Sequence, residues 1–210
     1  MRTELIADDL LPIEQPFDCA PWFYTGSEGF ANISSMPPTM VDYVLVEARP
    51  AADINSIAER VAAYILSDGT ISNSLMMPDA TLPDAVYFSN LSPNGSYYFV
   101  LRHQNHLPVI TANPHNTSNP ALVDFTQPAN ILDGSGQLTN LGNGKYGLKS
   151  GDISANGVIT VADFNIFTPQ TAGVNVYTPA DCNLDGNVTV ADFNQFSSNA
   201  SAIGVSIVRY

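Results

Sequence analysis

Two stretches of the chain carry oxygen-bearing side chains at the spacing of a calcium-binding loop. Asp152–Asn165 reads DISANGVITVADFN and Asp181–Asn194 reads DCNLDGNVTVADFN, so the two stretches share the string V-A-D-F-N. A twelve-residue calcium loop takes side-chain oxygens at positions 1, 3 and 5, glycine at 6, a backbone carbonyl at 7 and a carboxylate at 12. The expected ligands are Asp152, Ser154, Asn156, Val158, Thr160 and Asp163 in the first loop and Asp181, Asn183, Asp185, Asn187, Thr189 and Asp192 in the second. The pattern predicts two bound Ca²⁺ ions.

The two loops differ in charge. The second loop holds three carboxylates, those of Asp181, Asp185 and Asp192, whereas the first holds two. Because fewer charges bind a cation more weakly, the second site is expected to be the tighter one. The alternative interpretation is a pair of Asx-rich turns in which Asp and Asn cap the helices that follow. Two copies in the same register favour calcium over this alternative.

The pair of loops resembles a dockerin module, in which Asp stands at position 12 of each loop and a helix follows. Phe164 and Phe193 directly follow the two aspartates. The resemblance implies two short helices that pack on each other, and in cellulosomal dockerins positions 10 and 11, often Ser-Thr, contact a cohesin. Here these positions are occupied by Val161-Ala162 and Val190-Ala191. We therefore expect at least one Val-Ala face to be buried against the first domain or a neighbouring subunit.

The chain before the repeat carries short β-type runs separated by turn residues. These runs are Val41–Arg49, Val61–Ser67, Thr70–Ser72, Ala85–Phe88, Ser96–Arg102, Val109–Ala112, Leu122–Thr126 and Tyr146–Leu148. Asp68-Gly69 between two of them is a hairpin signal. The number and spacing of the runs predict a mainly β fold, in which an immunoglobulin-like β-sandwich precedes a small dockerin-like module of two calcium loops with short helices.

Four segments are expected along the chain. Residues 1–40 form an irregular segment packed on the sandwich, with a short helix over Arg2–Leu11. Residues 41–150 form the β-sandwich, and residues 151–200 form the dockerin-like module. Residues 201–210 form a tail that could add a strand.

Three further stretches are Val41–Glu47 (VDYVLVE), Tyr97–Leu107 (YYFVLRHQNHL) and Lys145–Asp152 (KYGLKSGD). Together with the paired A-D-F-N string, they are similar to a group of bacterial secreted surface proteins described as haemagglutinin-like or adhesin-like. The resemblance implies the C-terminal part of a longer secreted protein and carries no particular activity. The first residues do not form a signal peptide, so the protein is either cytoplasmic or a mature or truncated form of a secreted, cell-surface protein. We expect the second, because calcium loops of the extracellular affinity class, roughly 0.1–1 mM, would be empty at cytosolic calcium levels.

The charge composition narrows the classes of partner. Lys and Arg number 7 against 20 acidic residues, which gives a net charge of -13. This balance excludes a basic stripe for nucleic acid and disfavours binding to an anionic membrane surface. No apolar run approaches the roughly 20 residues that span a bilayer, so membrane insertion is not expected.

The cysteines and histidines leave alternatives open. Cys19 and Cys182 could form one disulfide or could be two unrelated thiols. His103, His106 and His115 follow a strand and could hold zinc or copper. No acidic residue or cysteine lies close to them in sequence, so a hydrogen-bonded structural role is favoured.

Catalysis has no positive sign in this sequence, because it lacks a paired-carboxylate pattern, a G-x-S-x-G elbow and a phosphate loop. We expect a non-enzyme. The first hypothesis is an extracellular calcium-binding structural or adhesion module, with a protein partner or self-association that could extend into fibres through an exposed edge strand. The alternative is a non-catalytic accessory module that binds carbohydrate or anchors to a scaffold in the dockerin–cohesin manner. The aromatic candidates for a glycan surface are Trp22, Tyr87, Tyr97 and Tyr98.

Overall fold

The computed structural model of the chain describes every residue except 78, 79, 81, 83, 120 and 210. The fold is mixed, with 26% of residues in strands and 19% in helices. The strands are β1 (Met40–Pro50), β2 (Glu59–Leu66), β3 (Ile71–Ser72), β4 (Ser96–His103), β5 (His106–Ile110), β6 (His115–Asn116), β7 (Leu138–Gly142) and β8 (Lys145–Leu148). The α-helices are α1 (Glu4–Ala7), α2 (Val161–Phe167) and α3 (Val190–Ser198). Short 3-10 helices are η1 (Ile33–Ser35), η2 (Ser74–Met76), η3 (Pro128–Asn130), η4 (Gly134–Gln137), η5 (Thr168–Gln170) and η6 (Ser206–Val208).

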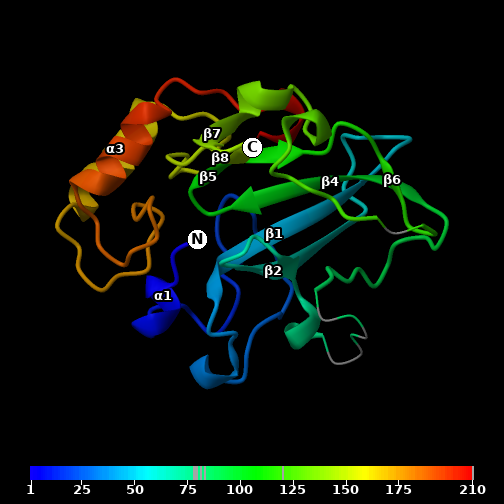
Figure 1. The fold of residues 1–210 in the computed structure, drawn as a ribbon, viewed down its shortest axis with the longest axis horizontal. Coiled ribbons are helices and arrows are strands. Elements are labelled where there is room, and N and C mark those ends of the chain that lie inside the picture. Colours follow the sequence, from blue (N-terminus) through cyan, green and yellow to red (C-terminus); the bar gives the residue numbers. More distant parts are fainter. Residues whose placement is uncertain (78–79, 81, 83, 120, 210) are drawn as a thin grey trace.

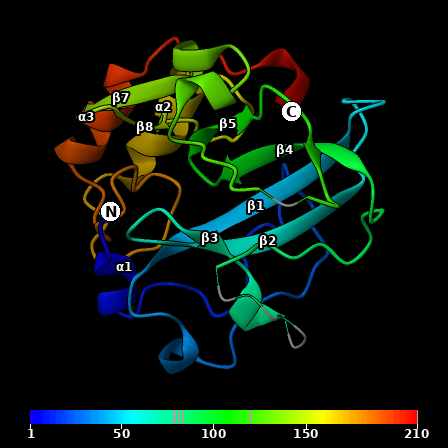
Figure 2. The ribbon, with the colours of Figure 1, turned by 45° about the vertical axis from the view of Figure 1, so that its right-hand side comes forward.

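One antiparallel sheet organises the molecule (Figure 1). Its strand order is β3-β2-β1-β4-β5, and the short strand β6 pairs with β4. The predicted Asp68-Gly69 turn joins β2 to β3, and Gly69 takes the positive φ of 97° that a tight hairpin turn requires. Strands β7 and β8 form a separate two-stranded sheet, which lies above the main sheet in Figure 2.

The predicted immunoglobulin-like sandwich is wrong, because the main sheet is a single curled half-barrel, and the described residues form no second sheet of comparable size facing it. Two of the predicted strands, Ala85–Phe88 and Leu122–Thr126, form neither strand nor helix. A third, Val109–Ala112, contributes its first two residues to β5 in the same main sheet. An apolar pattern reports burial, but it does not report which element covers the buried face.

Strand β1 shows why one sheet suffices, since ten of its eleven residues are buried. Tyr43 and Leu45 pack into a cluster with the N-terminal segment, and Val44 and Val46 pack into a second cluster on the opposite face. The second cluster is closed by irregular segments and by β7 and β8, from which Ile131 and Leu138 contribute buried side chains. Loops and hairpins therefore fill the place that a second sheet would take.

The N-terminal segment packs on the first face of the main sheet. Phe17 and Trp22 meet edge to face with ring centroids 5.2 Å apart, and both belong to the cluster that contains Tyr43. The helix expected over Arg2–Leu11 is shorter, since α1 covers four residues.

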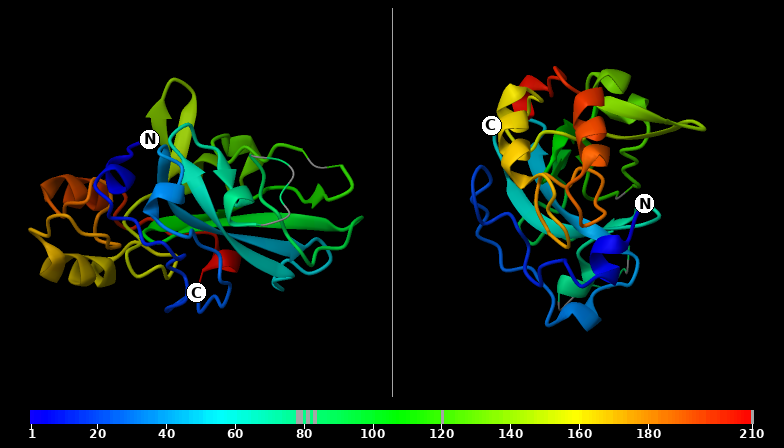
Figure 3. Two further views of the ribbon diagram at one scale, coloured as in Figure 1. Left: turned by 90° about the horizontal axis from the view of Figure 1, so that it is seen from below. Right: turned by 90° about the vertical axis from the view of Figure 1, so that its left-hand side faces the viewer.

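The two loop–helix repeats lie together at one end of the molecule. Figure 3 (left) shows α2 and α3 at the end opposite the far tips of the long strands, with α1 beside them. The tail forms η6 and one isolated bridge between Val158 and Ile203, and its described residues add no strand to the main sheet. None of the helices within the described residues is long and apolar enough to cross a membrane.

Candidate functional site: the paired loop–helix module

The two repeats fold into matching units in which a loop leads into a helix. Thr160 is the N-cap of α2, and its Oγ1 accepts a hydrogen bond from the N–H of Ala162 at 3.2 Å. Thr189 is the N-cap of α3, and its Oγ1 accepts from the N–H of Ala191 at 3.1 Å. A Thr N-cap with an acid three residues later is a capping box, which satisfies backbone donors that have no partner within the helix. The helices therefore begin where the sequence predicts.

In the first loop, the carboxylates of positions 1 and 12 accept hydrogen bonds from the loop's own backbone. Asp152 accepts from the N–H of Asn156 at 3.0 Å and from that of Gly157 at 2.9 Å. Asp163 accepts from the N–H groups of Ser154 and Thr160, both at 2.8 Å. Gly157 has a φ of 84°, the left-handed conformation for which position 6 needs glycine.

The second loop repeats this arrangement. Asp181 accepts from the N–H of Asp185 at 3.1 Å and from that of Gly186 at 2.7 Å. Asp192 accepts from the N–H groups of Asn183 at 3.1 Å and Thr189 at 2.8 Å. The two loops differ at position 3. In the first loop, the hydroxyl of Ser154 also donates to the Asp163 carboxylate at 2.8 Å. In the second loop, Asn183 Oδ1 is buried and has no hydrogen-bond partner within the described chain.

The prediction of two bound Ca²⁺ ions is corrected by this geometry. The structure gathers the predicted ligands into their two loops, but the described residues contain no group of three or more His, Cys, Asp or Glu side chains placed to hold a metal ion. The first loop has only two carboxylates, and in both loops the carboxylates at positions 1 and 12 are turned onto backbone N–H groups. The side chains close the loops and cap the helices, which is the Asx-turn alternative.

Burial changes the ionisation of the position-1 acids. Burial raises the pKa of Asp152 to about 7, although the Gly157 N–H lowers it. Burial likewise raises the pKa of Asp181 to about 6, against the hydrogen bonds from Gly186 and Asp185. Removal from water disfavours the charged form of a carboxyl group, and backbone donors offset only part of that cost.

The two cysteines are not joined. Cys19 is exposed and Cys182 is buried, and both thiols are free. Burial raises the pKa of Cys182 to about 12, and the nearby Asp192 adds to the shift. Cys182 therefore acts as a small apolar side chain in the cluster beneath the second loop.

Helices α2 and α3 meet through four phenylalanines. The ring centroids of Phe164 and Phe193 are 6.1 Å apart, and Phe193 also lies 6.2 Å from Phe167 and 6.3 Å from Phe196. Equivalent residues of the two repeats are buried to equal degrees. Phe164 and Phe193 are both 37% exposed, whereas Phe167 and Phe196 are inside. The shared string V-A-D-F-N therefore encodes a paired structural unit, in which each helix covers part of the other.

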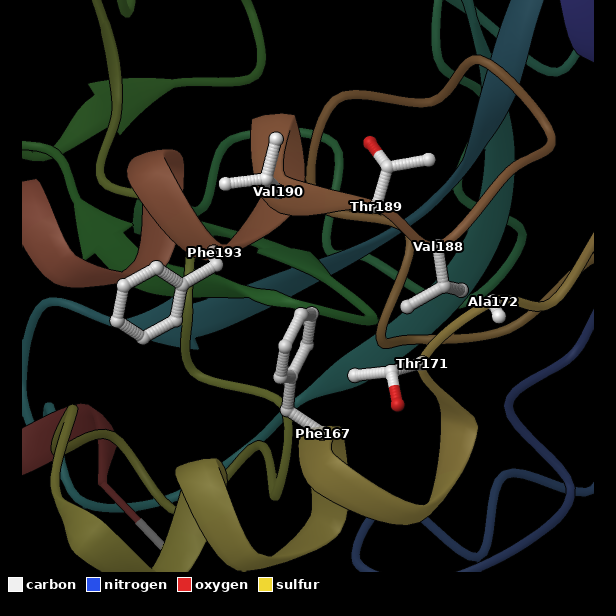
Figure 4. Close-up of a pocket in the computed structure, with 7 residues that line it drawn as sticks. All are labelled: Phe167, Thr171, Ala172, Val188, Thr189, Val190 and Phe193. Atoms are coloured by element: carbon white, nitrogen blue, oxygen red, sulfur yellow. The ribbon is translucent and has the colours of Figure 1, made fainter.

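The Val-Ala positions are exposed in the single chain, so their expected burial against the first domain is wrong, and the alternative of burial against a neighbouring subunit stays a prediction. Val161 is 71% and Val190 is 72% exposed. Beside Val190 lies a groove of about 510 Å³ between the two repeats (Figure 4). Its lining residues are Phe167, Thr171, Ala172, Val188, Thr189, Val190 and Phe193. We call the exposed side of α2 and α3, together with this groove, the α2–α3 face.

The module contributes little exposed charge to the α2–α3 face. Residues 150–208 include no Lys, Arg, His or Glu, and their five acidic residues are Asp152, Asp163, Asp181, Asp185 and Asp192. Four of these are buried, and the fifth, Asp185, is partly covered with Arg2 at 3.7 Å. Exposed surfaces of soluble proteins are normally rich in charged residues. The module instead presents valine, phenylalanine and isoleucine beside Asn, Gln, Ser and Thr.

A buried polar network fastens the module to the sheet at Asp42 of β1. Asp42 Oδ1 accepts from the hydroxyl of Tyr177 and from the N–H of Tyr43, both at 2.7 Å. Its Oδ2 accepts from Gln104 Nε2 at 3.0 Å and lies 3.0 Å from His103 Nε2. Because Asp42 is fully buried, these partners offset its desolvation. Tyr177 belongs to the segment between the two loops, so the bond ties the module to the sheet.

The turn between β4 and β5 completes the joint. Asn105 Nδ2 donates to the carbonyls of Pro179 at 3.0 Å and Asp181 at 2.8 Å. His103 Nδ1 lies 3.0 Å from both Asn105 Oδ1 and His106 Nδ1. Burial, with His103 beside it, holds the pKa of His106 well below its usual value. His103 and His106 therefore have the hydrogen-bonded structural role that the sequence favours. Sequence reasoning missed Asp42 and Tyr177 because they lie far apart along the chain.

A second buried polar cluster lies within the sheet. Glu47 Oε1 accepts from Arg102 Nε at 2.8 Å, and Glu47 Oε2 accepts from Arg49 Nη2 at 2.9 Å. The same two guanidinium groups donate to the tail, Arg49 to the carbonyl of Ile207 and Arg102 to that of Val208, both at 2.8 Å. The buried charges of the sheet are thus paired with one another and used to hold the tail.

Comparison with protein-family models, with curated proteins and with solved structures found no match.

Proposed function

We propose that this chain is a non-catalytic structural or adhesion module of a secreted or cell-surface protein, and that it docks to another protein through the α2–α3 face. One observation carries the proposal. The face combines exposed Val161 and Val190 with half-buried Phe164 and Phe193, on two helices whose exposed side chains carry no charge. Contiguous exposed apolar surface of this kind marks interaction sites, and the cores of protein interfaces are depleted in charged residues.

The repeat adds a second reason for this choice. The fold buries one phenylalanine of each helix, yet it leaves the valine at the start of each helix exposed to nearly the same degree. Stability alone gives no advantage to an exposed valine at both equivalent positions, because an apolar side chain in water contributes nothing by burial. A partner that covers both valines supplies the missing burial.

The polar clusters support a non-catalytic role. The carboxylate of Asp42 accepts three hydrogen bonds and lies 3.0 Å from His103 Nε2, and Glu47 is held between two arginines. These groups are occupied in joints that fix the sheet, the module and the tail. The adhesin-like resemblance, together with a surface rich in Asn, Ser and Thr, supports the extracellular location.

The alternative of a carbohydrate-binding surface is less well supported. Sugar-binding faces use exposed aromatic rings, but Trp22 and Tyr97 are buried and Tyr87 and Tyr98 are only partly exposed. Trp22 packs against Phe17 inside the N-terminal cluster. Strand addition is also disfavoured, because the edge strand β3 has two residues and β5 bonds to Ser150 beyond β8.

A displayed library of bacterial surface-protein fragments, panned with the full chain, tests the proposal. Fragments that are enriched should lose at least about tenfold in affinity when the chain carries Val161→Asp and Val190→Asp. The matched control is Leu75→Asp with Leu122→Asp, which places the same charges at two exposed leucines elsewhere. If the affinity of the enriched fragments falls with the control pair and is unchanged by the valine pair, the docking surface lies elsewhere and the proposal is contradicted. A glycan array run in parallel checks the alternative.

A further inference from the structure

We infer that the partner of the α2–α3 face is the same face of a second copy of this chain, in a two-fold symmetric pair. This inference rests on the proposed function and names its partner. An apolar centre alone would fit many partners. The rim around that centre makes the choice, since the rim decides which surfaces can approach without a penalty.

The exposed residues of α2 and α3 around this centre carry amides and hydroxyls and no charges. Asn165 and Asn194 are exposed at equivalent positions of α2 and α3, and Gln195, Thr168 and Ser197 extend the same polar surface. Amide and hydroxyl groups both donate and accept hydrogen bonds. Such a rim can pair with a copy of itself, whereas a rim with charges of one sign would repel its copy. Because the exposed residues of α2 and α3 carry no charge, this part of the rim offers no electrostatic selection for a charged foreign partner.

The position of the face allows a pair in spite of the net charge of -13. The face lies at one end of the molecule, so a second copy joined there points its own sheet away from the first (Figure 3, left). At physiological salt, exposed charges are screened beyond about 8 Å. Repulsion between the two acidic bodies is then weak, and it weakens further as salt is added. Self-pairing should therefore become tighter with added salt, whereas docking to a basic partner would become weaker.

The two equivalent exposed valines and the groove beside them also suit a two-fold pair. Each copy offers two exposed valines, at Val161 and Val190, and one groove lined by Phe167, Val188 and Phe193. In a two-fold contact the same patch serves on both copies, so the exposed valines of each copy pack against the groove of the other. Such a contact closes on itself, and this face alone would yield dimers and not fibres.

Sedimentation equilibrium of the full chain over a range of concentrations tests the inference. We expect a monomer–dimer equilibrium that Val161→Asp with Val190→Asp weakens at least about tenfold, and that Leu75→Asp with Leu122→Asp leaves unchanged. Circular dichroism and thermal melting of each variant confirm that it folds. A chain that stays monomeric at all concentrations, or a dimer that ignores the valine pair, would overturn the inference.

The rim has its own test. Asn165→Asp with Asn194→Asp adds like charges to the α2–α3 face of both copies in a pair, so the dimer should weaken at low salt and recover at high salt. The control is Asn113→Asp with Asn119→Asp, which adds the same charge at exposed positions elsewhere. Equal effects of the two pairs would contradict the two-fold arrangement. A monomeric chain that still binds fragments through the valine pair would overturn this inference and leave the proposed function intact.

Discussion

The sheet and the loop–helix module use charge in opposite ways. In the sheet, Glu47 is buried between Arg49 and Arg102, and opposite charges are paired inside the fold. In the module, the buried Asp152 and Asp192 accept backbone N–H groups, and no ion pair joins either of them to another described residue. Both solutions satisfy buried carboxylates, but they leave different surfaces. The module buries four of its five acids and leaves Val161 and Val190 exposed, which is the surface on which the docking proposal rests.

The largest expected effect comes from the sheet. Glu47→Gln removes the carboxylate and leaves two buried guanidinium groups without it, so the free energy of unfolding should fall by about 3–5 kcal/mol. The exposed Glu14→Gln should change it by less than about 0.5 kcal/mol. Urea denaturation of both variants measures the difference. A loss at Glu47 no greater than that at Glu14 would mean that the buried ion pairs do not stabilise the sheet.

The aromatic cluster of the module ranks next. Phe167→Ala removes a buried ring and leaves a cavity between the repeats, which should cost about 3 kcal/mol. Phe164→Ala removes a ring that is 37% exposed and should cost roughly half as much. Thermal melting gives the ranking. The reverse order would mean that Phe164 and not Phe167 holds the helices together.

The joint between the two regions should show a smaller effect. Asp42→Asn keeps the shape of the side chain but replaces one acceptor oxygen by a donor that faces other donors, so we expect a loss of about 2 kcal/mol. Tyr177→Phe removes a single hydrogen bond to the same group and should cost about 1 kcal/mol. Hydrogen exchange at residues 175–185 should speed up in both variants. Exchange that increases only inside the sheet would place the joint elsewhere.

The helix caps should give equal effects in the two repeats. Thr160→Ala and Thr189→Ala each remove one N-cap oxygen, and each should cost about 1 kcal/mol. Ser198→Ala, at the other end of α3, serves as a control. Losses that differ severalfold between the two repeats would show that the repeats are not energetically equivalent.

The dependence of folding stability on pH should show a smaller effect of the Glu47 ion pairs. Burial raises the pKa of Glu47, but Arg102 and Arg49 outweigh it, so its folded pKa lies below the usual 4.5. A depressed folded pKa gives stability that is present above the unfolded pKa and is lost as the pH falls through the folded value. Wild-type protein should therefore lose more stability than Glu47→Gln between neutral pH and pH about 3. Parallel acid curves for the two proteins would contradict the pairing.

The local part of this architecture could be predicted from sequence. The register of V-A-D-F-N, with glycine at position 6 and threonine at the helix start, sets the two loops and the starts of α2 and α3. Most strands of the main sheet were predicted as well, because their apolar runs and the Asp68-Gly69 turn are short-range signals.

The long-range part could not be predicted in the same way. The apolar residues Tyr43, Val44, Leu45 and Val46 indicate that both faces of β1 are buried. The same sequence pattern results whether a second sheet or a set of loops covers a face. The contact between Asp42 and Tyr177 depends on the packing of the module and has no sequence signal. The calcium prediction failed for a related reason. The Asp and Asn oxygens at this spacing can bind a cation, or they can accept hydrogen bonds from the backbone N–H groups of their own loop.

The central claim is that the α2–α3 face docks to a protein, and site-specific photo-crosslinking tests it most directly. A photoreactive phenylalanine analogue is placed at position 190 in the full chain displayed on a bacterial surface, with position 75 as the exposed control. The account predicts a discrete crosslinked product from position 190 and none from position 75, and the mass of that product tells a second copy from another protein. Discrete products from position 75 alone, or from neither position, would contradict the account.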